Sequence, residues 1–373
     1  MSKVQFSNTV SISELRTLIP LIATDLTPVI QSEPGCGKTS LLSMIAADNG
    51  DKWRSPVDGT SIEGDKFDYV YVDCPVKDMS DIGMTIPNHI TKQLEYYVSS
   101  LFNIGNSKPK VILLDEFMKS PKLMQVIYTR LMLERMLGDV PLTRGSQVFA
   151  TSNNASDAVG DSMLAHAGNR VCIMRMAKPT AEEWMAWAGL PENAISRVIR
   201  AFVAMFPRCM ASYIDGDQKD NPYIFKPQMS TLSFVSPRSL AKADVIIKNR
   251  DKMTENALKV ALGGTIGLSA AGDMAAFLSL EKSLVDVKDI IKSPEDIEVP
   301  KDISAQLMIM FQAVDSLATQ DELTKFMTFV ERIPSSEVQG VFFTMMMRNP
   351  KAIRLARNNT KIAAWAMNNH ELF

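Results

Sequence analysis

The chain has 373 residues, of which 46% are hydrophobic and 22% charged, and its formal net charge is −2. This composition is ordinary for a globular protein of two or three domains, and it excludes a global basic field that would attract nucleic acid or a membrane surface. The sequence also contains no uncharged apolar run near the roughly 18 residues that a spanning helix needs. Because the four cysteines are scattered and the three histidines form no ligand spacing with them, we expect reduced thiols, no zinc site and a cytoplasmic location.

The first strong motif lies at residues 27–40, after a lead-in helix that is expected to begin near Ser11. Val29 and Ile30 are typical of the end of a buried strand, and Leu41 opens the apolar spacing of a packed helix. A glycine-rich turn lies between them. The residues expected to contact a nucleotide are Glu33, Pro34, Gly35, Cys36, Gly37, Lys38, Thr39 and Ser40.

Strand, glycine turn and helix in this order are the context of a phosphate-binding loop. Gly35 and Gly37 allow several backbone N–H groups to point at one anion, beside the positive end of the helix dipole. Lys38 is expected to reach the β- and γ-phosphates, and the Thr39 hydroxyl to hold Mg²⁺. The strict pattern is not met, since Ser32 stands where the first glycine belongs. The alternative is a glycine turn that caps an ordinary helix.

The next elements lead to a pair of carboxylates. We expect a strand over 67–74, an irregular bridge over 76–90 and a helix over 91–102. The apolar run 111–114 then ends in Asp115 and Glu116. A buried parallel strand delivers its last residues to the crevice where ligands bind. Asp115 is therefore expected to hold Mg²⁺, and Glu116 to activate the attacking water. Alternatively, the two carboxylates cap the following helix.

Two further polar residues follow in the α/β part. A helix over 122–137 is expected to precede a strand ending at Asn153, whose amide could hydrogen-bond the attacking water or the γ-phosphate. An asparagine after a strand is also a common turn residue. A short helix is expected to close at 164–168. Arg170 then precedes a strand over 171–174, and we expect it to face outward, toward a neighbouring subunit.

From residue 178 the pattern becomes helical, with helices expected over 181–188, 194–206, 255–262 and 268–280. Ser236 is a candidate cap for a helix that starts at Pro237. Arg238 falls in the first turn of that helix, where the dipole disfavours a cation, which suggests a bound anion; a solvent-facing arginine is the alternative.

The charged stretch 282–302 resembles a linker or a domain edge, and helical faces continue from 303 to the end of the chain. Residues Ser336 to Gln339 are expected to form a capping box. Lys351, Arg354, Arg357 and Lys361 line one side of the last helical pattern, either as a solvated face or as a nucleic-acid contact.

In this order the motifs resemble an AAA+ ATPase, most closely of the MoxR group. The matching stretches are residues 33–39, 113–116, 149–153 and 236–238. Glu134-Arg135, ahead of the strand that ends at Asn153, matches as well. The resemblance implies a P-loop α/β core with a parallel sheet over 1–178, an all-α lid over 179–285 and an all-α C-terminal region over 286–373.

The resemblance also implies roles. Lys38 and Thr39 bind ATP and Mg²⁺, Asp115 binds Mg²⁺, Glu116 is the catalytic base and Asn153 is sensor 1. Arg170 is implied as the arginine finger, and Arg238 as sensor 2. The residues around the finger depart from the group's usual pattern, so Arg130, Arg135, Arg144 and Arg175 remain alternatives for that role.

Such proteins form homo-oligomeric, often hexameric rings, frequently with a partner that carries a von Willebrand factor A domain, and they remodel or activate proteins. Two other functions stay open. One is a DNA-associated AAA+ factor of the helicase-loader or clamp-loader type, for which the basic stripe near the C-terminus is the support. The other is an ATP-gated scaffold with little turnover, which the presence of Glu116 and Asn153 disfavours. No membrane partner is expected.

Overall fold

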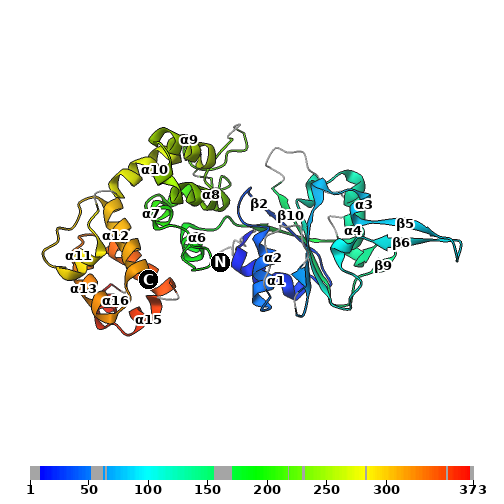
Figure 1. The fold of residues 1–373 in the computed structure, drawn as a ribbon, viewed down its shortest axis with the longest axis horizontal. Coiled ribbons are helices and arrows are strands. Elements are labelled where there is room, and N and C mark those ends of the chain that lie inside the picture. Colours follow the sequence, from blue (N-terminus) through cyan, green and yellow to red (C-terminus); the bar gives the residue numbers. More distant parts are fainter. Residues whose placement is uncertain are drawn as a thin grey trace, which may run out of the picture. The chain divides into compact units, whose positions relative to one another are not determined.

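The computed structural model describes residues 9–51, 62–63, 65–154, 170–216, 218–228, 232–281, 284–349 and 352–369. The chain divides into two compact units, Met1–Lys178 and Pro179–Phe373 (Figure 1). The short helix expected to close at 164–168 lies outside the described residues. Within the described ranges, none of the helices has the length and apolar character needed to cross a membrane.

The first unit is built on a seven-stranded sheet with the order β1-β11-β2-β10-β7-β4-β3. Adjacent strands are parallel except for β3, which pairs antiparallel with β4. The strands are β1 (Thr9–Val10), β2 (Pro28–Ser32), β3 (Ile62–Glu63), β4 (Asp68–Asp73), β7 (Lys110–Asp115), β10 (Gln147–Asn153) and β11 (Cys172–Met176). Because β10 lies between β2 and β7, the carboxyl ends of these three strands meet at one edge of the sheet.

Side chains of the central strands alternate between two hydrophobic layers. Val111 and Leu113 of β7 belong to the cluster that contains helices α1 (Ile12–Ile22) and α2 (Ser40–Asp48). Ile112 and Leu114 belong to the cluster that contains α4 (Lys122–Glu134), on the other face (Figure 1). A strand buried on both faces explains the continuous apolar run in the sequence. The expected fold class, a P-loop α/β core with a parallel sheet flanked by helices and followed by helical regions, is confirmed.

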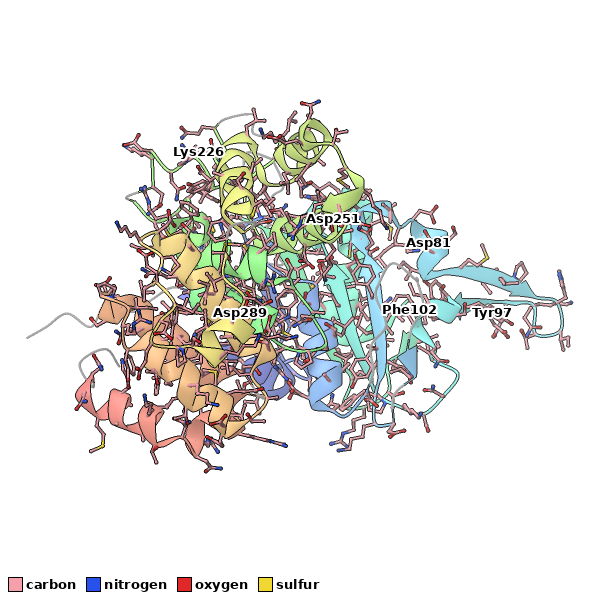
Figure 2. The ribbon with its side chains drawn as sticks, turned by 60° about the vertical axis from the view of Figure 1, so that its left-hand side comes forward. Asp81, Tyr97, Phe102, Lys226, Asp251 and Asp289 are labelled. Atoms are coloured by element: carbon pink, nitrogen blue, oxygen red, sulfur yellow. The ribbon has the colours of Figure 1, made fainter. Side chains whose placement is uncertain are left out.

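The helix expected over 91–102 was a wrong prediction. After the short α3 (Met79–Ile82), strands β5 (Gly83–Asn88) and β6 (Gln93–Val98) form an antiparallel hairpin, and the 3₁₀ turn Ser100–Phe102 follows. The hairpin projects from the unit and carries Tyr97 (Figure 2). Its Tyr96 ring lies so close to Gly83 and Gly138 that a Cβ at either glycine would clash with it. These contacts between residues far apart in sequence favour a strand at Tyr96 over a local helix.

Helix α4 is also shorter than expected, because it ends at Glu134 and not at residue 137. Arg135 adopts a left-handed conformation with φ of 56°. Its guanidinium donates hydrogen bonds to Thr27 Oγ1 and to the Ala23 carbonyl oxygen, each over 2.8 Å. The chain then turns at Gly138 between β8 (Met136–Leu137) and β9 (Val140–Pro141). Arg135 is therefore held inward at the end of α4, which makes it a poor candidate for an arginine finger.

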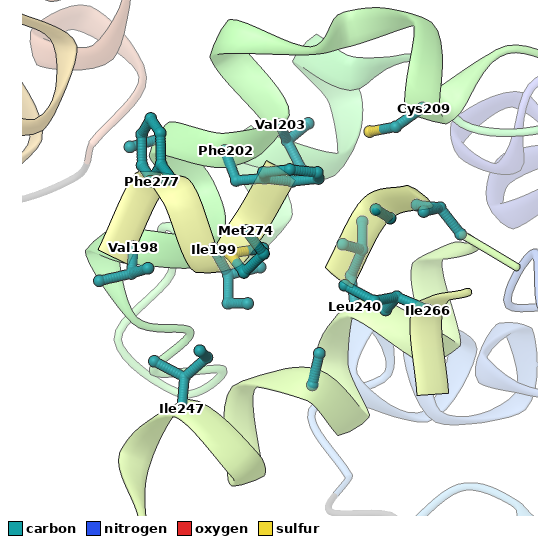
Figure 3. Packing of buried hydrophobic residues seen from close by; sticks show 14 of the residues in the cluster. Val198, Ile199, Phe202, Val203, Cys209, Leu240, Ile247, Ile266, Met274 and Phe277 are labelled. Atoms are coloured by element: carbon teal, nitrogen blue, oxygen red, sulfur yellow. The ribbon is translucent and has the colours of Figure 1, made fainter. Parts of the chain in front are cut away.

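The second unit is helical and contains two hydrophobic clusters. Its helices are α6 (Ala181–Ala188), α7 (Arg197–Met205), α8 (Pro237–Lys248), α9 (Glu255–Ile266), α10 (Leu268–Glu281), α11 (Val287–Lys292), α12 (Ile303–Ser316), α13 (Gln320–Val330), α14 (Ser336–Arg348), α15 (Ala352–Arg357) and α16 (Thr360–Asn368). The first cluster joins α6 to α10 with part of α12, and Figure 3 shows Phe202 and Phe277 within it. The second joins α11 to α16. Helix α12 contributes to both clusters.

Several expectations for this unit needed correction. The helix expected from 194 begins at Arg197, and the presumed linker 282–302 contains α11, whose Val287 and Ile290 are buried. The capping box expected at Ser336–Gln339 does not form. Ser335 caps α14 instead, accepting a hydrogen bond from Val338 N over 3.3 Å.

The basic stripe expected near the C-terminus is not one helix face. Arg354 and Arg357 belong to α15, whereas Lys361 belongs to α16, and Lys351 lies outside the described residues. The Lys361 ammonium donates to Thr328 Oγ1 over 2.7 Å, so its charge is held against α13.

Candidate active site

The glycine-rich loop that is expected to bind phosphate connects β2 to α2, as the sequence predicts. Gly35 and Gly37 have φ angles of 77° and 93°, a left-handed region that residues with a side chain seldom adopt. Ser32, which replaces the usual first glycine, is the last residue of β2 and therefore needs no glycine conformation. The departure from the strict motif leaves the loop geometry intact.

Lys38 is folded back onto this loop and onto β10. Its ammonium donates to the carbonyl oxygens of Ser32 and Glu33, both over 3.0 Å, and to Asn153 Oδ1 over 3.1 Å. The side chain is buried. A buried ammonium needs such acceptors, and the oxygens of a polyphosphate would supply the same kind of partner with more charge. The structure thus brings Lys38 and Asn153, which are 115 residues apart in sequence, into direct contact.

Asp115 is the centre of a second group of contacts at the end of β7. Its Oδ2 accepts hydrogen bonds from Thr39 Oγ1 over 2.9 Å and from the Tyr71 hydroxyl over 3.1 Å. Its Oδ1 accepts a very short one from Thr151 Oγ1. Only 7% of Asp115 is exposed, and its carboxylate is satisfied by three hydroxyl donors, which fix its orientation.

This donor set fits a magnesium ion. Thr39 and Asp115 offer a hydroxyl and a carboxylate oxygen within 2.9 Å of each other, and hard oxygen ligands are those that Mg²⁺ prefers. Within the described residues, no cluster of three or more His, Cys, Asp or Glu side chains could hold a metal ion alone. The remaining positions would thus be filled by phosphate and water oxygens, as is usual for Mg²⁺ bound with a nucleotide.

Glu116 lies one residue beyond the strand in an unusual backbone conformation. Its φ is 52°, which is uncommon for a residue with a side chain, and its N–H donates to Thr151 Oγ1 over 3.2 Å. The carboxylate is 2.9 Å from the Lys119 ammonium. The left-handed turn therefore directs Glu116 away from the line of β7, while Thr151 ties its backbone to β10.

Burial and crowding of carboxylates raise several pKa values here. The pKa of Asp73, at the end of β4, is raised by burial and by the nearby charges of Asp115 and Glu116. Burial and the same Asp115 charge raise the pKa of Tyr71, so this hydroxyl remains a donor. The concentration of negative charge is the arrangement expected where a cation is to be bound.

Arg170 lies away from this group. It is exposed and lies two residues before β11, whose first residue Cys172 pairs with Pro28 at the beginning of β2. Because β2 ends at Ser32 beside the loop, Arg170 lies at the opposite edge of the sheet. It cannot reach the phosphate loop of its own chain.

Arg238 belongs to the second unit, in the first turn of α8, and its side chain is exposed. The expected cap is present, since Ser236 Oγ accepts a hydrogen bond from Ser239 N over 3.1 Å. Among the alternative arginines of the first unit, Arg130 pairs with Glu134 over 2.8 Å, whereas Arg144 and Arg175 are exposed.

Sequence reasoning missed four residues of this site, namely Tyr71, Asp73, Lys119 and Thr151. Asp73 ends β4 as Asp115 ends β7, and the Cα pairing of these two residues places them side by side; Tyr71 lies two residues before Asp73. The alternation of β10 would have placed Thr151 on the same side as Asn153. That signal could have been used, but the partner of each hydroxyl depends on the strand order.

Comparisons with known proteins give only distant similarities. No protein-family model and no curated protein matches this sequence. Among solved structures, a RuvB variant from Thermotoga maritima is similar at 12% identity and a TM-score of 0.36, over 84% of this chain and 86% of the other. The T. maritima RuvB Holliday junction branch migration motor is similar at 13% identity and a TM-score of 0.35, over 79% and 78%. A candidate ATPase from Cytophaga hutchinsonii is similar at 16% identity and a TM-score of 0.30, over 79% and 92%. At this distance, the function is inferred from the geometry of the site itself.

Proposed function

We propose that this protein is a Mg²⁺-dependent ATPase of the AAA+ type. The observation that carries the proposal is the convergence of Lys38, Thr39, Asp115, Glu116 and Asn153 at the carboxyl edge of three adjacent strands, β2, β10 and β7. A protein that only needed a rigid fold would have little reason to gather a buried ammonium, a buried carboxylate and an amide around one glycine turn.

Each residue has a task that its position supports. Lys38 exchanges its acceptors on the loop for the β- and γ-phosphate oxygens, and Thr39 and Asp115 hold Mg²⁺. When bound, the ion neutralises charge that develops on the phosphates. Glu116 orients the attacking water and accepts its proton, and Asn153 contacts that water or the γ-phosphate. Lys119 holds the Glu116 carboxylate by an ion pair when no substrate competes for it.

The active form is a homo-oligomeric ring of six subunits, in which Arg170 acts on the site of the adjacent subunit. The support is the position of Arg170, which is exposed at the edge of the sheet opposite its own phosphate loop. An arginine supplied in trans makes hydrolysis conditional on assembly. Arg238, exposed in the first turn of α8, is the candidate for sensing the bound nucleotide.

The ring remodels or activates a protein, in the manner of the MoxR group, with a partner of the von Willebrand factor A type as the candidate adaptor. The β5–β6 hairpin supports a protein partner, because its large apolar side chains Met84, Ile86, Ile90, Leu94 and Tyr97 are all exposed. The DNA-associated alternative is less favoured, because Arg354 and Arg357 lie on α15 whereas Lys361 lies on α16.

The first test compares ATP binding and turnover in two variants. Lys38→Ala should lose ATP binding, whereas Glu116→Gln should bind ATP and turn over at most one hundredth as fast, a common cost of losing a general base. Lys259→Ala and Glu255→Gln, from an exposed ion pair on α9, are matched controls that should behave as wild type. Wild-type turnover by Glu116→Gln would refute the assignment of the base.

The second test asks whether active sites are completed between subunits. The ATPase rate per subunit should rise with protein concentration and then saturate. Arg170→Ala and Lys38→Ala should each be inactive alone, but an equimolar mixture should regain activity, because Arg170 of one subunit can serve an intact loop in another. A mixture as inactive as its components, in rings shown by mass measurement to contain both, would refute action in trans.

A further inference from the structure

The candidate metal site has two adjacent carboxylates at the carboxyl edge of the sheet. Asp115 ends β7, and Asp73 ends β4 directly beside it. Ca²⁺ takes more oxygen ligands than Mg²⁺ and binds carboxylates readily, whereas Mg²⁺ gives up its water reluctantly. Two adjacent carboxylates beside a bound nucleotide would therefore suit either ion, and selection of Mg²⁺ depends on whether they can ligate the ion directly.

Tyr71 is the residue of β4 that covers Asp115. It lies two positions before Asp73, so the side chains of both point to the same face of the sheet. Its half-buried ring packs against the hydrophobic cluster that contains α1 and α2. From this position the Tyr71 hydroxyl donates a hydrogen bond to Asp115 Oδ2 over 3.1 Å. The same oxygen accepts from Thr39 Oγ1 over 2.9 Å.

These two hydrogen bonds saturate Asp115 Oδ2. A carboxylate oxygen has two lone pairs, and Oδ2 directs one to Thr39 and the other to Tyr71. Oδ1 is engaged separately, because it accepts from Thr151 Oγ1 on β10. The oxygen that contacts Thr39 therefore has no lone pair left for a direct bond to a cation held by that residue.

The two hydroxyls on Oδ2 differ in what they can do for an ion. Thr39 donates its hydrogen to Asp115 and keeps the lone pairs of its oxygen, so it can hold a cation without breaking this bond. Tyr71 serves only as a donor here, and within the described part of the chain Asp115 is the acceptor of that hydrogen bond. Giving it up would leave the Tyr71 donor without a protein partner, which has a free-energy cost.

We propose that Tyr71 is a specificity-determining residue of the metal site, and that its hydroxyl favours Mg²⁺ over Ca²⁺. This inference rests on the proposed ATPase function. By occupying Oδ2, Tyr71 restricts Asp115 to holding the ion through water. Mg²⁺, which keeps its water, tolerates this restriction, whereas Ca²⁺ loses a carboxylate that it would bind directly. Removal of the hydroxyl frees Oδ2 beside Asp73, and Ca²⁺ then gains more than Mg²⁺.

The test measures nucleotide binding in the full-length protein and does not depend on turnover. The Kd of the ATP analogue AMP-PNP is measured by isothermal titration calorimetry in excess Mg²⁺, in excess Ca²⁺ and in EDTA. Wild type should bind more tightly in Mg²⁺ than in Ca²⁺. In Tyr71→Phe, the ratio of the Kd in Ca²⁺ to the Kd in Mg²⁺ should fall at least about fivefold. The Kd in EDTA should not change, because the Tyr71 hydroxyl bonds to Asp115 and not to the glycine loop.

Tyr69→Phe is a matched control on the same strand. Tyr69 lies two residues before Tyr71 and packs in the same cluster. Its hydroxyl also donates to a carboxylate, that of Asp51 over 2.8 Å. Tyr69→Phe should therefore lower the melting temperature about as much as Tyr71→Phe but keep the wild-type ratio of the two Kd values. The same fall of the ratio in both variants would overturn the assignment to Tyr71.

Two further results separate this inference from the proposed function. If wild type binds AMP-PNP more tightly in Mg²⁺ than in EDTA and Tyr71→Phe keeps the wild-type ratio, the inference is overturned and the ATPase proposal stands. If wild type binds equally in Mg²⁺ and in EDTA, the proposed function fails and this inference fails with it. Where Tyr71→Phe does not fold, Tyr71→Met takes its place, since methionine also lacks the hydroxyl and adapts to irregular packing.

Discussion

Thr151 on β10 links Asp115 and Glu116 of the candidate active site. Replacing it by valine should lower both the stability of the first unit and the ATPase rate. Its hydroxyl donates to Asp115 and accepts the Glu116 N–H, and the residue is fully buried. Valine has the same shape but offers neither bond. A hydrogen bond to a charged group contributes about 1.5–3 kcal/mol and a neutral one about 0.5–1.5. Asp115 keeps its hydrogen bonds from Thr39 and Tyr71 in the variant. We therefore expect Thr151→Val to lower the free energy of unfolding of the first unit by roughly 2–4 kcal/mol.

Thr151→Ser is the matched control, since it keeps the hydroxyl and removes one buried methyl group, at a cost of about 1 kcal/mol. The free energy of unfolding of the first unit should decrease from wild type to Thr151→Ser and again to Thr151→Val. The ATPase rate should be near wild type for serine and at least about tenfold lower for valine, because a misdirected Asp115 or Glu116 raises the barrier by 1.4 kcal/mol or more.

Cysteine alkylation in urea, followed by peptide mass spectrometry, can measure the opening of the first unit. Cys74 is fully buried there, and burial raises the pKa of its thiol well above its usual value, so it reacts only when the unit opens. Cys209 is buried in the second unit and serves as the internal reference. If Thr151→Val matched Thr151→Ser in both Cys74 protection and ATPase rate, the proposed role of the hydroxyl would be wrong.

Three other substitutions test separate parts of the structure. Lys119→Met should raise the ATPase rate by up to about fivefold, because an ion pair this exposed contributes at most about 1 kcal/mol and its loss frees Glu116; a fall below the wild-type rate would contradict this. Asp73→Asn should slow Cys74 alkylation at pH 7 without Mg²⁺. The raised pKa of Asp73 means that the folded state holds the proton more tightly than the unfolded state, so protonation stabilises, and wild type should approach the variant as the pH falls through that raised pKa. Faster Cys74 alkylation in Asp73→Asn than in wild type at pH 7 would contradict this prediction, because it would mean that the charged carboxylate stabilises the first unit. Ser236→Ala should destabilise the second unit by about 1 kcal/mol through loss of the α8 cap, read from Cys209 alkylation, with Cys74 unchanged.

The local sequence was enough to predict the parts of the molecule that depend on neighbouring residues. The glycine loop, the strand that ends in Asp115 and the cap at Ser236 are present in the structure. Each is formed by residues within one strand, one turn or one helix start, where side-chain type and spacing decide the conformation. The two-layer core followed from the same signals, since a run of apolar residues in a short strand requires cover on both faces.

Only the tertiary structure decided which of these parts meet. The order of strands places β10 between β2 and β7, and so brings Asn153 to Lys38 and Thr151 to Asp115. Nothing within the stretch 91–102 shows that Tyr96 will pack on two distant glycines, and this packing accompanies a strand where a helix was expected. The hydrogen bond from Tyr71 to Asp115 likewise joins two strands whose residues are 44 positions apart. Contacts between residues far apart in sequence carry the free energy that overrides local preference, and no pattern within a single segment contains them.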